Sequence, residues 1–304
     1  MKKSILILTS LSDNERNVAE AGLLLAVQLH KNVILLHSDD AFTGVVYYPG
    51  LPVLTESPLS QQERKNKITL LANNLKQTFE GTHSGQFQPR IQTLIMEGDL
   101  GSNVKNILKK YPIEMIAIGA STGSAAEHLL LGSETTAIAH QSDVPVLVIP
   151  HGWGGNRIRF ITFATRFLEQ DGVALQYLFT LRKYLGAYLD IVNIKKYNQP
   201  NLTDNSDLLK LITKQRASHP EFISYHSVHG KDLVPRLKRY CKENNSEVLA
   251  LSRSHHSFLF RLLNTGTVDK YLSGHRIPLL IIPALESDDQ LHDDPLKSLS
   301  GIVF

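Results

Sequence analysis

Short apolar runs alternate with amphipathic stretches along the first half of the chain. The apolar runs have the length of strands, and apolar residues recur at helical spacing between them. Strands that are separated by helices run parallel and are joined by right-handed crossovers. The pattern therefore predicts the α/β class, with an open, doubly wound parallel sheet. The expected strands are 4–8, 32–37, 90–96, 113–118 and 145–149, and the expected helices include 61–80, 102–110 and 133–141.

One segment, residues 39–57, interrupts this alternation. It contains Gly44, Pro49, Gly50 and Pro52 within a short stretch. Glycine and proline are punctuators of regular secondary structure. We therefore expect an irregular insertion between the second strand and the next helix.

The second half of the chain repeats the first. A shift of 133 positions carries the Pro-x-Leu-x-Ile-Pro pattern of residues 145–150 onto residues 278–283 without a gap. Near the start of each copy the shift is 156, which aligns Thr9 with Thr165, because the second copy lacks most of the insertion. The expected strands of the second copy are 159–164, 188–194, 221–228, 248–251 and 278–282.

The repeat predicts two tandem domains, each built on a five-stranded sheet. The first domain is expected at 1–150 and the second at 156–284, joined by a glycine-rich linker at 151–155. An acidic C-terminal tail at 285–304 is expected to be loosely held, as chain termini often are.

The composition is that of a globular protein of two ordinary domains. The chain has 304 residues, of which 42% are hydrophobic and 20% are charged. Its 32 basic and 29 acidic residues give a net charge of +3, too small to indicate a nucleic acid or a membrane surface as partner. Cys241 is the only cysteine, which excludes an intramolecular disulfide and a cysteine-based zinc site. The histidines do not have the spacing of a zinc site either, so no metal site is expected.

The apolar run at residues 5–8 is too short for a secretory leader, which needs about 7–15 apolar residues. No stretch approaches the roughly 20 apolar residues of a membrane-spanning helix. We therefore expect a cytoplasmic protein.

The loop between residues 119 and 135 is the segment best suited to bind a ligand. It follows an expected strand and ends where an expected helix begins, with Gly132 just before that helix. Free amides and the positive end of the dipole at a helix N-terminus bind anions, and the hydroxyls of Ser133 and Thr135 add donors. In a doubly wound sheet, ligands bind where the strand order reverses. The same residues also suit a structural role, with Gly119 in a turn and Ser133 as a helix cap.

With these residues, the chain resembles the universal stress protein family in its tandem two-domain form. The resemblance extends from the start of the sequence to about Pro283. The family's phosphate-binding motif is Gly, two residues, Gly, nine residues, Gly, and then Ser or Thr. Gly119 holds the first place and Gly132-Ser133 the last two, whereas Thr122 holds the second place and Gly123 lies one step late. The resemblance implies a Rossmann-like fold of the adenine nucleotide alpha hydrolase type, with strand order 3-2-1-4-5. It also implies that the two copies pair through their last strands as a pseudo-twofold dimer within one chain.

The resemblance further implies that the first domain binds ATP or another adenine nucleotide, with Mg²⁺ accompanying it. Family members that bind nucleotides carry an Asp after a Thr at the tip of the first strand, where it contacts the adenine. Here Thr9 fits, but Ser10 replaces the Asp and cannot offer a carboxylate. Ser38 is expected near the ribose and base. The full set of expected nucleotide-binding residues is Thr9, Ser10, Ser38, Gly119, Thr122, Gly123, Gly132, Ser133 and Thr135.

The second copy departs further from the motif and is not expected to bind ATP in the family manner. The four motif positions are occupied by Ser252, His255, Thr265 and Gly266. Arg166 stands at the position of the strand-one Asp. Two interpretations remain open for the basic residues of this copy. They could converge on an anion, with Arg166, Arg253 and His255 as its ligands, or the arginines could be solvated or paired across the domain interface.

Three functions remain open at this point. The first is a stress-response binding module that works through nucleotide occupancy. The second is a scaffold or partner-binding protein in which both sites are eroded. The third is a weak nucleotide hydrolase. The loop offers only Glu127 and His128 as a general base, so no catalytic residue is assigned.

Overall fold

The computed structural model describes residues 2–11, 16–39, 45–48, 51–54, 60–82, 87–122, 129–130, 133–155, 157–169, 171–196, 206–231, 233–253 and 277–283. The expected tail at 285–304 lies outside these residues.

Strands and helices alternate along the first half as the apolar pattern predicts. The elements are β1 (Ser4–Leu8), α1 (Arg16–Gln28), β2 (Asn32–Asp39), β3 (Val45–Tyr48), β4 (Leu51–Leu54), α2 (Gln61–Thr82), β5 (Ile91–Glu97), α3 (Leu100–Lys110), β6 (Ile113–Gly119), β7 (Ser121–Thr122), β8 (Leu129–Leu130), α4 (Ser133–Gln141) and β9 (Val146–Ile149). All four residues of β9 are buried, as expected of a parallel strand that is covered on both faces.

The second half repeats the order. Its elements are β10 (Phe160–Thr165), α5 (Asp171–Leu185), β11 (Tyr188–Lys196), α6 (Ser206–Ser218), β12 (Ile223–Gly230), α7 (Leu233–Glu243), β13 (Val248–Arg253) and β14 (Leu279–Pro283). None of the described helices is long and apolar enough to cross a membrane.

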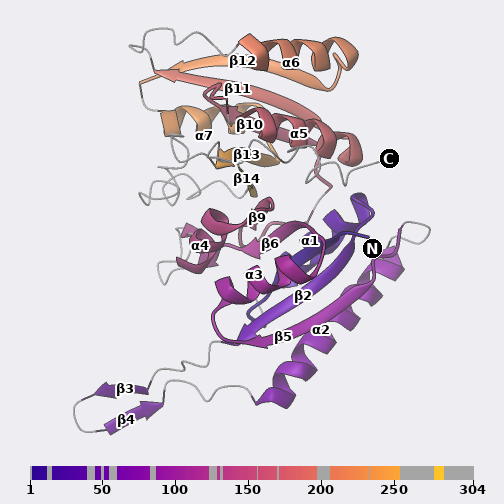
Figure 1. Cartoon of the computed structure of the whole chain (residues 1–304), viewed down its shortest axis with the longest axis vertical. Coiled ribbons are helices and arrows are strands. Elements are labelled where there is room, and N and C mark those ends of the chain that lie inside the picture. The colour runs from indigo at the N-terminus through magenta and orange to yellow at the C-terminus, as the bar shows by residue number, and fades with distance from the viewer. Residues whose placement is uncertain are drawn as a thin grey trace.

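The prediction of an irregular insertion at 39–57 is wrong in part. The segment contains the antiparallel pair β3 and β4, in which Val45 lies opposite Leu54 and Tyr47 opposite Pro52. Figure 1 shows this hairpin projecting away from the rest of the chain. A two-stranded sheet consists of two edge strands, which tolerate a proline that a central strand would exclude. Valine and tyrosine favour the strand despite the neighbouring glycines.

One ten-stranded sheet runs through both halves. Its order is β12-β11-β10-β13-β14-β9-β6-β1-β2-β5, so each half has the order 3-2-1-4-5. Strands within each half are parallel, with β1 between β2 and β6 and β10 between β11 and β13. Figure 1 shows the two halves meeting at β9 and β14. This architecture confirms the expected fold class.

The strands β9 and β14 join the two halves in an antiparallel pair. Leu147 lies opposite Leu280, and Val148 lies opposite Leu279. Leu147 and Leu280 are also the residues that the shift of 133 positions makes equivalent. The pseudo-twofold axis therefore passes between these two side chains, so that each half covers the apolar edge strand of the other.

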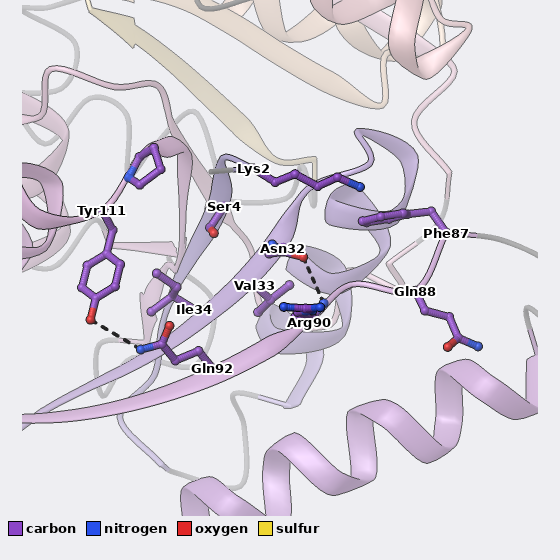
Figure 2. Close-up of a pocket in the computed structure, with 11 residues that line it drawn as sticks. Lys2, Ser4, Asn32, Val33, Ile34, Phe87, Gln88, Arg90, Gln92 and Tyr111 are labelled. Atoms are coloured by element: carbon purple, nitrogen blue, oxygen red, sulfur yellow. Dashed lines mark hydrogen bonds between the residues drawn. The ribbon is translucent and has the colours of Figure 1, made fainter.

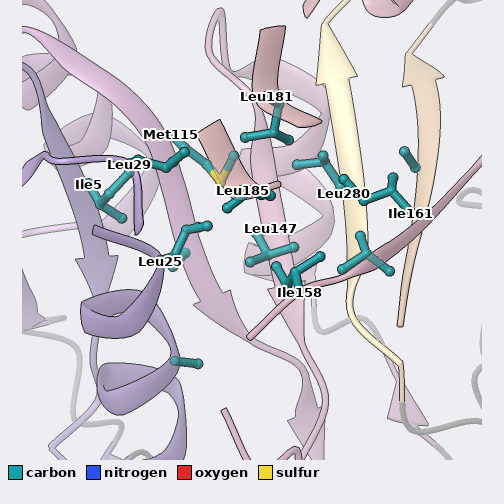
Figure 3. Packing of buried hydrophobic residues seen from close by; sticks show 14 of the residues in the cluster. Ile5, Leu25, Leu29, Met115, Leu147, Ile158, Ile161, Leu181, Leu185 and Leu280 are labelled. Atoms are coloured by element: carbon teal, nitrogen blue, oxygen red, sulfur yellow. The ribbon is translucent and has the colours of Figure 1, made fainter. Parts of the chain in front are cut away.

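Two apolar layers enclose the sheet, and both continue across the junction. One layer packs under α1, α2, α5 and α6, and Figure 3 shows it from Ile5 and Leu25 through Leu147 to Leu280 and Leu185. The other layer packs under α3, α4 and α7 and includes neighbouring residues of the same strands. Successive residues of a strand point to opposite faces, which is why one strand supplies both layers. Because neither layer ends at the junction, the two halves share their cores.

Candidate functional site

The carboxyl ends of β1 and β6 form the place where the strand order reverses in the first half. Residues on both sides of that reversal belong to the expected nucleotide site. Thr9 and Ser10 follow β1, Gly119 ends β6, and Thr135 lies in the first turn of α4. The structure brings these residues to neighbouring strand ends, because β1 and β6 pair directly. Ser38 lies on β2, on the other side of β1.

Thr9 shapes the turn that follows β1. It is buried, its hydroxyl oxygen accepts a hydrogen bond from the amide of Leu11 at 3.1 Å, and Leu11 has a φ of 61°. The carbonyl of Thr9 accepts from Nδ1 of the buried His37 at 2.9 Å. These contacts hold the chain in a left-handed conformation that branched residues rarely adopt. As a result the neighbouring Ser10 is exposed at the tip of the strand.

The same turn follows the first strand of the second half. The hydroxyl of Thr165 accepts from the amide of Phe167 at 2.9 Å, and Phe167 has a φ of 59°. Thr9 and Thr165 are the residues aligned by the shift of 156 positions. The repeat thus preserves a local hydrogen bond as well as the order of the elements.

The hydroxyl of Ser38 forms hydrogen bonds with neighbouring groups of the protein. Its hydroxyl donates to the carbonyl of Gly98 at 2.8 Å and accepts from Nδ2 of Asn103 at 2.7 Å. Asn103 is 5% exposed and also donates to the carbonyl of Glu97 at 3.1 Å. The sequence prediction missed Asn103, although a polar residue on the apolar side of the helix before Val104 and Ile107 was a usable signal. Together these bonds tie the ends of β2 and β5 to α3.

The start of α3 is held by a capping residue. The Asp99 carboxylate accepts from the amide of Ser102 at 2.9 Å. The hydrogen bond from the Ser102 side chain, followed by the one from its amide, lowers the pKa of Asp99 below its usual value. Gly98, at a φ of 99°, turns the chain into the helix, a conformation that suits glycine. At the end of β2, Asp39 forms an ion pair with Arg64 of α2 at 2.7 Å. The carboxylates at this edge therefore serve the fold.

A hydrogen bond sets the start of α4 beside the end of β6. The hydroxyl of Thr135, which is 4% exposed, donates to the carbonyl of Gly119 at 3.4 Å. A Cβ atom at Gly119 would lie 3.1 Å from Cγ2 of Val18, so α1 packs closely on this strand end. The helix begins at Ser133 with Glu134 in its first turn. The amino end of α4 therefore lies near the carboxyl end of β6.

The remaining expected site residues fall on or near a short antiparallel pair. Thr122 belongs to β7, which pairs with β8 so that Thr122 lies opposite Leu129. Gly123 and Gly132 lie outside the described residues, as do the two candidate bases Glu127 and His128. Within the residues that the structure describes, no group of three or more His, Cys, Asp or Glu residues comes together as a metal site would require.

In the second half, a buried carboxyl group lies beside the end of the first strand, β10. Asp171, 3% exposed, accepts from the hydroxyl of Thr165 at 2.5 Å and from the amide of Leu168 at 3.2 Å. Ser252, the counterpart of Gly119, is buried at the end of the adjacent strand β13. A carboxylate at this position disfavours a bound phosphate. The second half is therefore poorly suited to the family's ligand.

One of the three basic residues that were expected to converge on an anion in the second half, Arg253, binds protein groups instead. The guanidinium of Arg253 donates to three carbonyl oxygens of the first half, those of Ala139 at 3.3 Å, His140 at 2.7 Å and Ser142 at 2.8 Å. Arg253 thus caps the carboxyl end of α4 across the domain interface. His255, the third residue of the hypothesis, lies outside the described residues.

The buried Asp171 makes stability depend on pH. Burial raises the pKa of the Asp171 carboxyl above its ordinary value of 3.8, and the Thr165 hydroxyl opposes part of this effect. The folded protein therefore binds more protons at Asp171 than the unfolded chain between pH 3.8 and the raised pKa. Stability from this group is fully present below that window and falls as the pH rises through it. We expect Asp171→Asn to remove this decline, as measured by urea unfolding across the window.

Asp207→Asn serves as the control for that measurement. The Asp207 side chain is 83% exposed and forms a surface ion pair with Lys210 at 3.0 Å. Its removal should leave the dependence of stability on pH unchanged. An Asp171→Asn variant with the same pH dependence as Asp207→Asn would contradict the assignment.

Comparisons with known proteins agree with this architecture. Residues 1–150 match the model of the universal stress protein family. A universal stress protein from Archaeoglobus fulgidus DSM 4304 aligns with 92% of this chain and 96% of its own, at 17% identity and a TM-score of 0.67. A functionally unknown protein from Pseudomonas aeruginosa PAO1 aligns with 93% of each chain, at 12% identity and a TM-score of 0.63. Among curated proteins, no sequence matches this chain.

Identities this low show a shared fold and carry no information about ligands. The fold is shared over both halves, because each of the two solved structures covers more than nine tenths of the chain. The match to the family model adds the sequence relationship, over the half that contains the loop at 119–135. Through residues 1–150, the chain therefore belongs to the universal stress protein family.

Proposed function

We propose that residues 1–150 form a stress-response domain that binds ATP or another adenine nucleotide at the carboxyl ends of β1 and β6. The observation that carries the proposal is the hydrogen bond between Thr135 and Gly119, which sets the start of α4 beside the end of β6. Free amides at a helix N-terminus favour a phosphate group. Membership of residues 1–150 in the family supports the same assignment.

The expected site residues take two roles in this proposal. Thr9, Ser38 and Thr135 shape the site, since the hydroxyl of each is engaged by neighbouring backbone or side-chain groups. The exposed Ser10 faces the base. The phosphates lie along the loop, with Mg²⁺ bound through their oxygens, and the loop residues in contact are Gly119, Thr122, Gly123, Gly132 and Ser133.

The second domain, proposed at 156–284 after the linker at 151–155, does not bind a nucleotide. Support comes from the buried carboxyl of Asp171 beside the end of β10, and from Ser252 in place of the first glycine. Its role is to cover the edge strand of the first domain and to hold α4 through Arg253. The protein then works through occupancy of one site and not through catalysis.

ATP is expected to raise the melting temperature of the full chain. A ligand at a hundredfold excess over its Kd stabilises the native state by about 2.7 kcal/mol, which amounts to roughly 5 °C for a protein of this size. Gly132→Val should abolish the rise, because the added side chain occupies the space that a phosphate needs beside the helix start. Differential scanning fluorimetry with and without ATP measures both.

Gly266→Val, which changes the second copy of the motif, serves as the matched control and should keep the full rise. A parent protein that shows no rise at millimolar ATP contradicts the nucleotide proposal. An equal loss in both glycine variants also contradicts the assignment to the first domain.

A second candidate function is that of a scaffold without nucleotide. Two observations favour it: the first domain lacks a carboxylate at Ser10, and in the second domain Arg166 stands at that position while Asp171 is buried beside the end of β10. Mass spectrometry of small molecules that co-purify with the protein separates the two functions. An adenine nucleotide that survives dialysis excludes the scaffold.

A further inference from the structure

A second concave site lies at the opposite edge of the first domain's sheet, at the amino ends of β1, β2 and β5. The cavity has a volume of about 670 Å³, within the range of small-molecule sites. Figure 2 shows it between Tyr111 and Gln92 on one side and Lys2 and Phe87 on the other. The nucleotide site proposed above lies at the carboxyl ends of β1 and β6, at the opposite edge of the sheet.

The floor of the cavity is a row of small and polar residues across three strands. Ser4 on β1 lies opposite Asn32 on β2, and the amide of Val33 donates to the carbonyl of Arg90 at the start of β5. The side-chain oxygen of Asn32 also accepts from the amide of Arg90 at 3.1 Å. This hydrogen bond, drawn in Figure 2, fixes the row.

A second row lies two residues further along the strands, about 7 Å away. It contains Ile34, which pairs in register with Gln92. The helix α3 covers this face of the sheet nearer the carboxyl ends of the strands. It ends at Lys110, so the face is not covered by α3 from Tyr111 on. Gln92 donates to the hydroxyl of Tyr111 at 3.4 Å, which places the aromatic ring at the end of the second row.

The second domain shows that the open floor comes from the sequence and not from the fold. There the equivalent row is aromatic: Phe160 lies opposite Tyr188, and the amide of Leu189 donates to the carbonyl of Phe222. The rings of Phe160 and Tyr188 lie 6.1 Å apart. The second domain thus has bulky rings at the positions where the first has Ser4, Asn32 and Arg90.

The charged side chains that line the cavity, among the described residues, are all positive. Among the described residues that line it, Lys2 and Arg90 are cationic and none is acidic. The ammonium of Lys2 lies 4.7 Å from the centre of the Phe87 ring, which holds it at the rim. Arg90 is exposed to solvent. The two cations therefore lie beside the row that contains Gln92 and ends at the ring of Tyr111.

We propose that this cavity binds a small organic anion with a flat aromatic body. Its acidic group binds Lys2 and Arg90, and its ring packs beside Tyr111. Binding at this edge leaves the carboxyl ends of β1 and β6 untouched.

Titration calorimetry of the full chain with 2-naphthoate tests the proposal. We expect saturable binding of one molecule per chain. The uncharged 2-naphthalenemethanol and the Lys2→Gln, Arg90→Gln double variant should each weaken binding about tenfold or more, a difference of 1.4 kcal/mol or more. Both side chains are exposed, so their replacement is compatible with folding.

Two further variants make the test specific. Lys65→Gln removes an exposed cation from α2 and should bind 2-naphthoate like the parent. Asn32→Tyr copies the residue of the second domain, Tyr188, and should block the cavity. The proposal is overturned if 2-naphthoate does not bind at millimolar concentration, or if the double variant and Lys65→Gln bind it equally. A 2-naphthoate affinity that Gly132→Val leaves unchanged separates this result from the outcome of the ATP experiment.

Discussion

Replacing Leu147 or Leu280 with alanine is expected to lower the free energy of unfolding by about 2–5 kcal/mol in each case. Each side chain is 2% exposed, and the two lie directly opposite each other where β9 meets β14. Figure 3 shows both in the apolar layer that runs through the two halves. Removing either leaves a cavity at the pseudo-twofold axis, which neither half can close alone.

The two substitutions should also be coupled. The first removes part of the contact that the second would remove, so the double variant is expected to lose less than the sum, with an interaction energy of about 0.5–3 kcal/mol. Urea unfolding of the two single variants and the double variant measures this energy. The pair Leu147 and Leu189 is the control, because Leu189 is equally buried but lies four strands away on β11.

The control pair should be additive within about 0.5 kcal/mol. Additivity of Leu147→Ala with Leu280→Ala would show that the two halves do not share a core at this junction. The pairing of β9 with β14 would then not hold in solution.

Arg253→Met is expected to cost about 1.5–3 kcal/mol of stability, the range of a hydrogen bond to a charged group. The guanidinium of Arg253 binds the carbonyls of Ala139, His140 and Ser142 at the carboxyl end of α4. A cation at that end also interacts favourably with the negative end of the helix dipole. Methionine retains the apolar stem, so the loss reports the guanidinium group. Urea unfolding gives the free energy.

Two comparisons locate the effect. Arg159→Met removes an arginine whose side chain is 69% exposed and whose partner Glu247 lies 3.6 Å away, and it should change stability by no more than about 0.5 kcal/mol. Hydrogen exchange should speed up at the amides of α4 in Arg253→Met and not in Arg159→Met. Equal effects of the two variants on stability and exchange would contradict a capping role for Arg253.

The Arg253 contact also breaks the symmetry of the repeat. Its counterpart in the first half is Ala120, which has no group that could cap a helix. Among the described residues, Arg253 holds the α4 of the first domain, and Ala120 offers no side chain for the equivalent contact. On the proposed function, the second domain thus supports the helix whose amino end receives the phosphate, and Arg253→Met should also reduce the rise in melting temperature with ATP.

The architecture could be predicted from the sequence because it depends on periodicity and repetition. Buried parallel strands such as Val146–Ile149 are continuous apolar runs, and the helix at Ser133–Gln141 has the predicted bounds. The repeat at a spacing of 133 positions indicated which strand of one half would correspond to β9 of the other. The hairpin in the insertion could not be predicted in this way, because the surrounding glycines and prolines obscure the strand preference of the valines and tyrosines between them.

The candidate site could be predicted only as a location. The motif indicates the loop at 119–135 and the tip of β1, and the structure places Gly119, Thr135 and Ser10 at those neighbouring strand ends. The sequence motif does not reveal that the hydroxyls of Thr9 and Ser38 are engaged in hydrogen bonds within the fold. Such bonds join residues that are close in space, and Asn103 lies 65 positions from Ser38.

The sequence by itself determined the α/β class, the alternation of strands and helices and the repeat of this pattern in the second half, because local periodicity and a repeated pattern are properties of the chain alone. The strand order 3-2-1-4-5 was implied by the family resemblance. Only the tertiary structure decided what individual polar groups do. Asp171 is buried against Thr165, Arg253 caps a helix of the other half, and Ser4 and Arg90 border an open cavity. The free energy of a polar group depends on its solvent exposure and its partners in space, and neither is encoded at any single position.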